Sequence, residues 1–257
     1  MKQTSHKETS WGKEAQWYAS HLEESDTYHA KVIVPHLLRV VSPEGGLKVL
    51  EVGCGEGFIA RALWRAGATV TACDIAPELI EIAKQKDGDI EYRTSRAEDL
   101  SWSKTCTYDV VVAVLTLQNM EKIEPVFQEI SRVLKKNGRC VFVLNHPAFR
   151  IPKVTHWGFD EQAHIQYRRA DAYLSPRREI IDMHPGKKRK STSVTYSFHR
   201  SLQDYMKALR ASKFAITRLE EWISHRTSEK GPRAKAENRA RNEFPLFMMI
   251  ECTKNVS

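Results

Sequence analysis

A glycine-rich turn between a strand and an amphipathic helix is the feature that most constrains the fold of this chain. The turn reads Glu51-Val-Gly-Cys-Gly-Glu-Gly57 and follows the strand-like segment 48–52. Apolar side chains at positions 58, 59, 62, 63 and 66 then repeat with helical spacing. Glycine lets the backbone turn sharply and approach a ligand closely. The pattern therefore predicts a strand, a ligand-binding turn and a helix in succession.

Strand-like and helix-like segments alternate through most of the chain. The predicted strands are 48–52, 69–73, 90–92, 109–115, 140–144, 214–219 and 245–252. The predicted helices are 58–66, 77–86, 123–135, which Asn137-Gly138 should end, and 202–213, which Ser201 and Asp204 should cap. Such alternation is typical of a parallel sheet with helices on both faces. We therefore expect a doubly wound α/β domain.

Two segments fall outside this rhythm. Residues 11–41 are rich in Trp, Tyr and His and should be mostly helical, so we assign a helical lid to residues 1–44 and the main domain to 45–257. Residues 147–200 hold several prolines, many arginines and scattered aromatic side chains, with short strand-like pieces near 179–183 and 192–198. We interpret this second segment as an insertion on the substrate side of the domain.

Composition excludes several classes of protein. With 257 residues and 41% hydrophobic content, the chain can fill a substantial core. Its longest apolar runs, 109–115 and 140–144, fall far short of the roughly 18 to 20 residues that span a bilayer. The five cysteines are odd in number and contain no C-x-x-C pair, which argues against a disulfide framework or a zinc site. Residues 1–13 show no secretory signal. We expect a cytoplasmic protein with neither a metal nor a membrane partner.

The net charge of +8 is unevenly distributed along the chain. Residues 1–150 carry 19 Lys and Arg against 20 Asp and Glu, whereas residues 151–257 carry 21 against 12. A basic surface attracts nucleic acid, anionic lipid or a small anionic substrate. The alternative is a solvated face that serves solubility. The sequence leaves both interpretations open.

The acidic residues around the glycine turn indicate the kind of ligand it binds. Asp74 ends the next predicted strand, where a carboxylate can accept hydrogen bonds from both hydroxyls of a ribose. Glu51 precedes the first glycine by two residues. A carboxylate there repels the phosphates of a dinucleotide but suits an amino group or a cationic sulfonium. A nucleoside-type cofactor is implied.

Five ordered blocks make the chain resemble the class I S-adenosylmethionine-dependent methyltransferases. The blocks are 49–57, 73–80, 97–100, 108–111 and 129–139. The resemblance implies S-adenosyl-L-methionine as the cofactor and a Rossmann-like, seven-stranded sheet with the cofactor across its carboxyl edge. It also implies that the last strand, 245–252, is antiparallel.

The resemblance assigns cofactor contacts residue by residue. It implies that Asp74 binds the ribose and that Ile75 packs against the adenine. Arg96 occupies the place where the family often has an Asp for the adenine amino group, so the Ala97 backbone and the Glu98 side chain are the expected substitutes. Glu98 as a solvated loop acid is the alternative. The full set of expected cofactor residues is Glu51, Gly53, Cys54, Gly55, Gly57, Asp74, Ile75, Ala97, Glu98 and Leu115.

Methyl transfer from a sulfonium requires few catalytic residues, because the protein mainly positions, desolvates and sometimes deprotonates the acceptor. His146 directly follows the fifth strand, and a pKa near 6.5 suits a general base at neutral pH. The alternative is that His146 only hydrogen-bonds the strand end ahead of Pro147. His199 and Arg200 are secondary catalytic candidates.

Aromatic and basic residues of the lid and the insertion should face the acceptor. Gln118 and Asn119 follow the fourth strand and either contact the acceptor or satisfy loop backbone groups. Arginine matches a carboxylate or phosphate with two parallel hydrogen bonds, so we expect a small anionic acceptor that bears one of these groups. The expected substrate residues are Tyr18, Tyr28, Gln118, Asn119, Arg150, Tyr167 and Arg168.

Three functions compete. The first is an enzyme that methylates a small molecule. The second is an RNA methyltransferase that uses the basic C-terminal part, although the chain has Leu117-Gln-Asn-Met120 where base-amino methyltransferases carry an Asn/Asp-Pro-Pro-aromatic block. The third is a cofactor-binding protein without catalytic activity.

Overall fold

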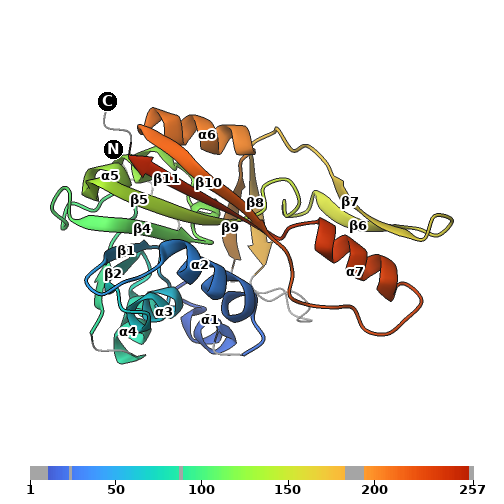
Figure 1. Ribbon diagram of the computed structural model, residues 1–257, viewed down its shortest axis with the longest axis horizontal. Helices are drawn as coiled ribbons and strands as arrows, with labels where there is room; N and C mark the ends of the chain where they lie inside the picture. Colours follow the sequence, from blue (N-terminus) through green and yellow to red (C-terminus); the bar gives the residue numbers. More distant parts are fainter. Residues whose placement is uncertain (1–10, 23–24, 87–88, 183–193, 255–257) are drawn as a thin grey trace, which may run out of the picture.

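In the computed structural model, one seven-stranded sheet runs through the middle of the molecule (Figure 1). The structure describes residues 11–22, 25–86, 89–182 and 194–254. The strand order is β10-β11-β5-β4-β1-β2-β3. These strands are β1 Lys48–Val52, β2 Thr69–Asp74, β3 Glu91–Thr94, β4 Tyr108–Val114, β5 Leu134–Asn145, β10 Phe214–Trp222 and β11 Phe247–Lys254.

Strand directions fix where a ligand-binding edge can lie. Strands β1 to β5 pair in parallel, whereas β11 is antiparallel to both β5 and β10. The predicted sheet with an antiparallel last strand is therefore confirmed. Because β11 runs the opposite way, its first residue, Phe247, pairs with Asn145 at the carboxyl end of β5. Loops after β1, β2, β4 and β5 all emerge at this carboxyl edge, where ligands bind in open α/β sheets.

Helices cover both faces of the sheet (Figure 1). Helices α2 Val34–Val41, α3 Phe58–Arg65 and α4 Pro77–Lys86 pack on one face, and α5 Glu124–Val133 and α6 Leu202–Ala211 pack on the other. Successive residues of β4 contribute to opposite faces, because Val110 joins the first core cluster and Val111 joins the second. A central strand buried on both faces explains the continuous apolar run seen in the sequence.

The N-terminal segment is helical where the structure describes it. Helix α1 Ala15–Leu22 packs against α4, with Ala15 beside Ala76 and Leu79. A π-helical turn, η1 His29–Ile33, leads directly into α2. Residues 1–10 and 23–24 of the predicted lid lie outside the described residues. The division into a lid and a main domain stays a prediction.

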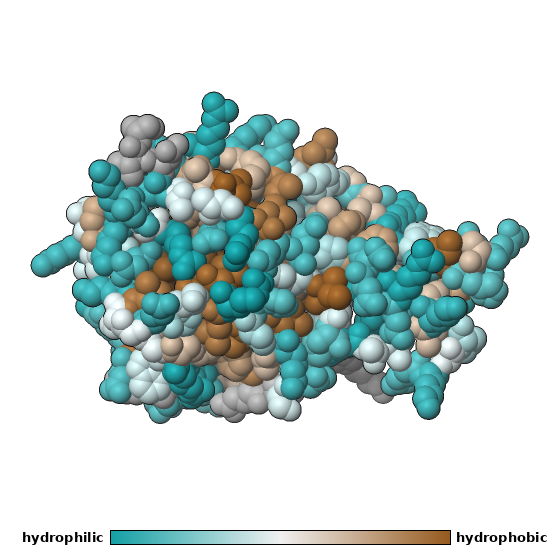
Figure 2. Space-filling model, in the orientation of Figure 1, coloured by the Kyte–Doolittle hydropathy of each residue, from teal (hydrophilic) through white to brown (hydrophobic). Residues whose placement is uncertain are grey.

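The insertion forms two antiparallel hairpins. The first joins β6 Thr155–Asp160 to β7 Ile165–Ala170, and the second joins β8 Arg177–Asp182 to β9 Val194–His199. The sequence pattern indicated only the second hairpin. Helix α7 Ala234–Glu243 was also not predicted, because its residues are charged on all sides and only Ala240 is buried. Hairpin β6–β7 and α7 lie together at one end of the molecule (Figure 1), and hydrophilic side chains cover most of this end (Figure 2).

The junction between α5 and β5 differs from the expectation. We predicted that the helix reaches residue 135, but α5 ends at Val133 and β5 begins at Leu134. Leu134 is extended, with ψ of 138°, and pairs with Tyr108 of β4. At Gly138, a Cβ atom would lie 3.1 Å from the Asp109 carbonyl oxygen. Gly138 therefore permits two strands to pass closely and does not end the helix.

The predicted cap of α6 is confirmed. Ser201 Oγ accepts a hydrogen bond from the Asp204 amide, and Asp204 Oδ2 accepts one from the Ser201 amide at 3.0 Å. This reciprocal capping box satisfies donors at the first turn of the helix. In the described part of the chain, no helix is long and apolar enough to cross a membrane.

Candidate functional site

The glycine-rich turn lies at the carboxyl edge of the sheet, between β1 and α3. Gly53, Gly55 and Gly57 have φ values of 72°, 55° and 81°, which side chains other than glycine rarely allow. At Gly53, a Cβ atom would lie 2.1 Å from Thr116 Oγ1. Glycine is thus required where the loop after β4 approaches the turn. Cys54 is buried, and its amide donates to the Cys73 carbonyl oxygen at 3.0 Å.

Asp74 connects the turn to the end of β2. Its Oδ2 accepts a hydrogen bond from the Gly55 amide at 2.8 Å, and its Oδ1 accepts one from the Ala76 amide at 2.9 Å. Burial raises the pKa of this carboxyl, and the backbone amides oppose the rise. Each carboxylate oxygen can accept a further hydrogen bond. Ile75 lies beside it with 44% of its surface exposed, so a flat apolar ring can pack there.

Glu51 is a buried carboxylate with an unused acceptor. It is 1% exposed, and its Oε2 has no hydrogen-bond partner among the described residues. Desolvation raises its pKa well above the ordinary value. A buried carboxylate is costly unless a cation or a donor compensates it. The residues present therefore fit a cationic amino group or sulfonium, as the sequence suggested.

A buried ionic network supports the turn, and sequence reasoning missed it. Glu56 is fully buried; its Oε2 lies 2.7 Å from Arg61 Nη2 and 2.9 Å from Lys86 Nζ. Arg61 Nη1 also donates to the Glu56 carbonyl oxygen at 2.6 Å. Because Glu56 lies within the turn, these contacts fix its backbone. The only sequence signal was the presence of Arg61 in the predicted helix 58–66. The structure shows that this arginine is buried.

Ala97 and Glu98 lie in the loop after β3. Ala97 is buried, whereas Glu98 is partly exposed and its Oε1 accepts a hydrogen bond from Arg96 Nε at 2.7 Å. Arg96, the residue that departs from the family pattern, therefore pairs with the acid proposed to replace the missing Asp. A role for Glu98 at the adenine stays a prediction.

The loop after β4 adopts an unusual backbone conformation. Leu115 has φ of 52°, and its carbonyl oxygen accepts hydrogen bonds from Gln118 Nε2 at 2.8 Å and Asn119 Nδ2 at 3.4 Å. The two amide groups thus satisfy a loop carbonyl, which is one of the two roles expected for them. Gln118 Oε1 is buried and has no partner among the described residues, so this atom remains available to a ligand.

His146 uses both ring nitrogens within the protein. Nε2 lies 2.7 Å from Glu221 Oε1, and Nδ1 accepts a hydrogen bond from the Ala148 amide at 3.2 Å. The ring is 5% exposed, and desolvation lowers its pKa while Glu221 opposes this shift. The contacts indicate a neutral ring with its proton on Nε2. A role as base requires the Nδ1 contact to open, and it stays a prediction.

His199 and Arg200 join the insertion to the loop after β4. His199 is buried and its Nε2 lies 2.7 Å from the Tyr173 carbonyl oxygen. Arg200 Nη2 donates to the carbonyl oxygens of Met120 and Glu121 at 2.7 Å and 2.5 Å. The structure thus brings Arg200 to the same loop as Gln118. Their catalytic role, like that of His146, stays a prediction.

Tyr28 and Arg150 meet at the first residue of β11. The Arg150 guanidinium lies 5.1 Å from the centre of the Phe247 ring, and the Tyr28 ring lies 5.7 Å from the same ring. Arg226 stacks on Tyr28 at 4.9 Å. The N-terminal segment and the insertion therefore approach each other at the carboxyl edge of the sheet.

Two of the remaining expected substrate residues, Arg168 and Tyr167, lie on strand β7 of the first hairpin. Arg168 donates to the Phe149 carbonyl oxygen at 2.9 Å and to Thr155 Oγ1 at 2.8 Å, which commits much of its guanidinium. Tyr167 is 47% exposed and lies across hairpin β6–β7 from Gly158. The side chain of Tyr18 lies outside the described ones. Their contribution to acceptor binding stays a prediction.

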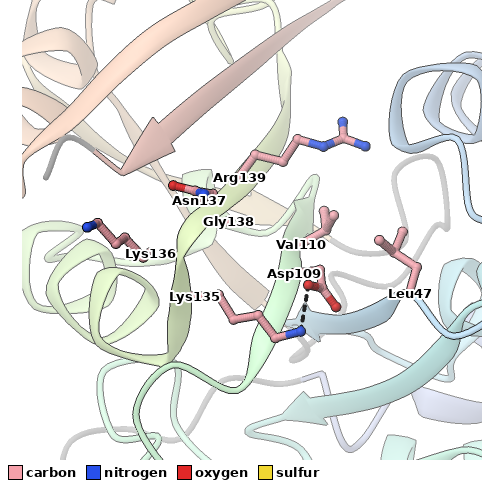
Figure 3. Close-up of a pocket in the computed structure, with 8 residues that line it drawn as sticks. All are labelled: Leu47, Asp109, Val110, Lys135, Lys136, Asn137, Gly138 and Arg139. Carbon is pink, nitrogen blue, oxygen red and sulfur yellow. Dashed lines mark hydrogen bonds and ion pairs between the residues drawn. The ribbon is translucent and has the colours of Figure 1, made fainter.

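A cavity lies at the opposite, amino edge of the sheet (Figure 3). Its volume is about 380 Å³. Lys135 Nζ lies 2.6 Å from Asp109 Oδ1, and Asp109 Oδ2 accepts a hydrogen bond from the Lys48 amide. Arg139 donates to the carbonyl oxygens of Val40 and Val41. Because these cations already have partners, the cavity size alone does not identify a ligand site.

Comparison with known sequences identifies the central part of the chain. Residues 50–142 match the family model described as a methyltransferase domain. The ubiquinone biosynthesis O-methyltransferase of Xanthomonas oryzae pv. oryzae is 34% identical over 98 residues, which cover 37% of this chain and 41% of the relative. The protein of the same name from Xylella fastidiosa is 35% identical over 101 residues, which cover 38% of this chain and 41% of that relative. The chain thus spans about two fifths of the length of these curated relatives.

Comparison with solved structures extends over nearly the whole chain. An S-adenosylmethionine-dependent methyltransferase from Mesorhizobium loti has a TM-score of 0.68 at 20% identity, covering 89% of this chain and 99% of its own. The complex between the Haloferax volcanii Trm112 methyltransferase activator and a putative methyltransferase gives 0.66 at 16% identity, covering 97% and 100%. At these identities the likeness establishes the fold.

Proposed function

Because residues 50–142 match a methyltransferase domain and the chain shares the fold of S-adenosylmethionine-dependent methyltransferases, we propose that the protein binds this cofactor and transfers its methyl group to a small anionic acceptor. One observation carries the proposal. Glu51, Asp74 and the glycine turn meet at the carboxyl edge, and Glu51 Oε2 is buried without a partner. A dinucleotide phosphate is unsuited to this environment, whereas a positively charged sulfonium amino acid compensates the carboxylate.

The chain's own residues divide the work at this site. Asp74 would hold the ribose, Ile75 would cover the adenine, and Glu51 would compensate the charge of the methionine portion. When bound, S-adenosylmethionine supplies an activated methyl group. The protein then has to align the acceptor, exclude water and, for an unionised acceptor, take up a proton. His146 is our candidate for the proton acceptor.

A small acceptor agrees with the relatives named ubiquinone biosynthesis O-methyltransferases. The alternative, an RNA acceptor, relies on the basic C-terminal part. Several of its cations are already paired, because Arg233 contacts Glu161, Arg169 lies 2.9 Å from Asp171 and Arg177 lies 3.1 Å from Glu179. The excess of basic residues in 151–257 already subtracts these acids, so charge does not decide between the acceptors, whereas the names of the relatives favour a small molecule. We therefore favour the small acceptor.

Calorimetric titration tests the proposed cofactor. We expect saturable binding of S-adenosylmethionine and of its demethylated product, and Asp74→Ala should weaken binding by about 1 to 3 kcal/mol, the range for charge-assisted hydrogen bonds. Glu81→Gln, an exposed change on α4, is the matched control. Preference for NAD would contradict the proposal.

Transfer of a labelled methyl group then tests the acceptor and the remaining alternatives. Small acids should become labelled. A steep loss of nucleic-acid affinity with rising salt, together with labelled RNA, would instead support the RNA alternative. Cofactor binding with no labelled product from either class would support a non-catalytic protein.

A further inference from the structure

A small cavity lies at the carboxyl edge between the loop after β4, the end of β5 and the insertion. Its lining includes Gln118, Asn145, Arg150, His199, Arg200 and Tyr205. The enclosed space is about 20 Å³, which is room for one water-sized group. The cavity therefore accommodates the end of a molecule and not a whole acceptor.

Two of the residues that line this cavity carry buried polar atoms of complementary type. Arg200 Nη1, a donor, and Gln118 Oε1, an acceptor, each lack a hydrogen-bond partner among the described residues. Both side chains are fixed by other hydrogen bonds, because Arg200 Nη2 donates to the Met120 carbonyl oxygen and Gln118 Nε2 donates to the Leu115 carbonyl oxygen. Buried polar atoms are normally paired, so a group that offers an acceptor to Arg200 Nη1 and a donor to Gln118 Oε1 would satisfy both atoms.

A second guanidinium adds positive charge at the same place. Arg150 stacks on Phe247 and forms no ion pair with any carboxylate of the described residues, and the same holds for Arg200. Burial and the neighbouring Arg168 lower the pKa of Arg150. Burial raises the pKa of the Tyr205 phenol, so it supplies no compensating charge, although Arg200 opposes that rise. The lining of this cavity therefore includes two arginines that form no ion pair with a carboxylate of the described residues.

We propose that the cavity binds the carboxylate of the methyl acceptor between Arg150 and Arg200, while Gln118 Oε1 accepts a hydrogen bond from a neighbouring hydroxyl or amino group. The acceptor is thus a small hydroxy acid or amino acid. Arginine forms paired hydrogen bonds with either a carboxylate or a phosphate, and the restricted space favours the smaller, flat carboxylate. This inference rests on the proposed function and specifies its substrate class.

Binding of three probes to the protein saturated with S-adenosylhomocysteine tests the inference. The probes are 3-hydroxybenzoate, benzoate, which lacks the hydroxyl, and 3-hydroxybenzamide, which lacks the charge. We expect 3-hydroxybenzoate to bind more tightly than benzoate, and the amide to bind at least tenfold more weakly than 3-hydroxybenzoate. Calorimetry measures all three affinities.

Variants assign the affinity to this cavity. Arg150→Gln should weaken 3-hydroxybenzoate binding at least tenfold, and Gln118→Leu should reduce it to the affinity of benzoate. Arg210→Gln, which removes an exposed arginine of α6, should leave the affinities for 3-hydroxybenzoate and for benzoate unchanged. If Arg150→Gln does not fold, Arg150→Lys replaces it in the test. This variant keeps the charge and should bind 3-hydroxybenzoate with an intermediate affinity.

Three results would overturn the inference. The first is equal affinity of Arg150→Gln and the unaltered protein for 3-hydroxybenzoate, and the second is equal affinity of the amide and the acid. The third is the absence of acid binding by protein that binds S-adenosylhomocysteine normally, which leaves the proposed function intact. Loss of S-adenosylhomocysteine binding itself would contradict the proposed function as well.

Discussion

His146 Nε2 and Glu221 Oε1 lie 2.7 Å apart at the carboxyl edge of the sheet. His146 follows β5 and Glu221 belongs to β10, so their contact spans the intervening strand β11. The His146 amide also donates to the Leu246 carbonyl oxygen just before β11. The pair therefore holds the ends of three strands together and fixes the imidazole at the carboxyl edge of the sheet.

We predict that His146 assists methyl transfer and does not bind the cofactor. His146→Ala should lower turnover by about 10²-fold, the low end for losing a general base, and should leave the dissociation constant of S-adenosylmethionine nearly unchanged. Single-turnover kinetics and calorimetry measure the two quantities separately. Glu221→Gln keeps an oxygen acceptor for Nε2 and is the control for ring position.

The opposite outcome is equally specific. If His146→Ala changes neither turnover nor the Michaelis constant of the acceptor by more than about twofold, a few tenths of a kcal/mol, the residue serves only the strand ends. An acceptor that is already ionised in water needs no base. In that case the substitution should raise the Michaelis constant of the acceptor and leave turnover unchanged.

Stability should depend on pH through His146. Burial lowers its pKa in the folded protein below the ordinary value of 6.5. Below pH 6.5 the unfolded chain therefore binds more protons at this site, and stability rises with pH. The contribution should be complete above 6.5 and decrease as the pH falls through that value. Melting temperatures of the protein and of His146→Gln between about pH 5 and 8 should converge toward the acidic end.

Glu51 should release a proton when the cofactor binds. Its pKa lies well above the ordinary 4.5 in the free protein because the carboxyl is desolvated, and a bound cation favours the ionised form. Calorimetry in buffers of different ionisation enthalpy should detect this proton. Glu51→Gln should bind S-adenosylmethionine without proton release and about tenfold or more weakly. Identical buffer dependence in both proteins would disprove the role of Glu51.

The same pKa shift predicts the stability of the free protein. A raised pKa means that the folded state binds more protons than the unfolded state above pH 4.5, so stability falls as the pH rises through that value. Glu51→Gln removes the titrating group. The variant should therefore melt at a higher temperature than the unaltered, cofactor-free protein at neutral pH, and differential scanning calorimetry measures this difference.

Glu56 should stabilise the fold more than an exposed acid does. Glu56→Gln leaves Arg61 without its buried carboxylate and should lower the free energy of unfolding by about 3 kcal/mol. Glu81→Gln, which removes an exposed pair with Lys84, should cost less than about 1 kcal/mol. Urea denaturation compares the two. Equal effects would show that the buried network adds nothing to the stability of the turn.

The sequence predicted the sheet because each central strand carries an uninterrupted apolar run and each glycine or cap leaves a local signal. Val110 and Val111 face different core clusters, and the Ser201 cap is present as expected. Helix α7 left no such signal, since a helix that buries only Ala240 has no apolar stripe. Hairpin β6–β7 was missed because most of its side chains are exposed and none of them is fully buried.

The site was predictable where backbone geometry defines it and less so where side chains meet across the fold. The positive φ of Gly53 and the contact between Asp74 and Gly55 follow from the glycine turn itself. The contact of His146 with Glu221 joins residues 75 positions apart, which no local pattern encodes. The unpaired atoms of Gln118 and Arg200 likewise emerge only from tertiary packing.

The insertion leaves the chain after β5, whereas all the expected cofactor residues lie between positions 51 and 115. The segment that carries Arg150 and Arg200 can therefore change in length or composition without disturbing the backbone around Gly53 and Asp74. Under the proposed roles, Arg150 and Arg200 lie in a stretch of sequence separate from the cofactor residues, whereas Gln118 lies three positions after Leu115. A chain organised in this way can evolve toward new acceptors while it retains the machinery that activates the methyl group.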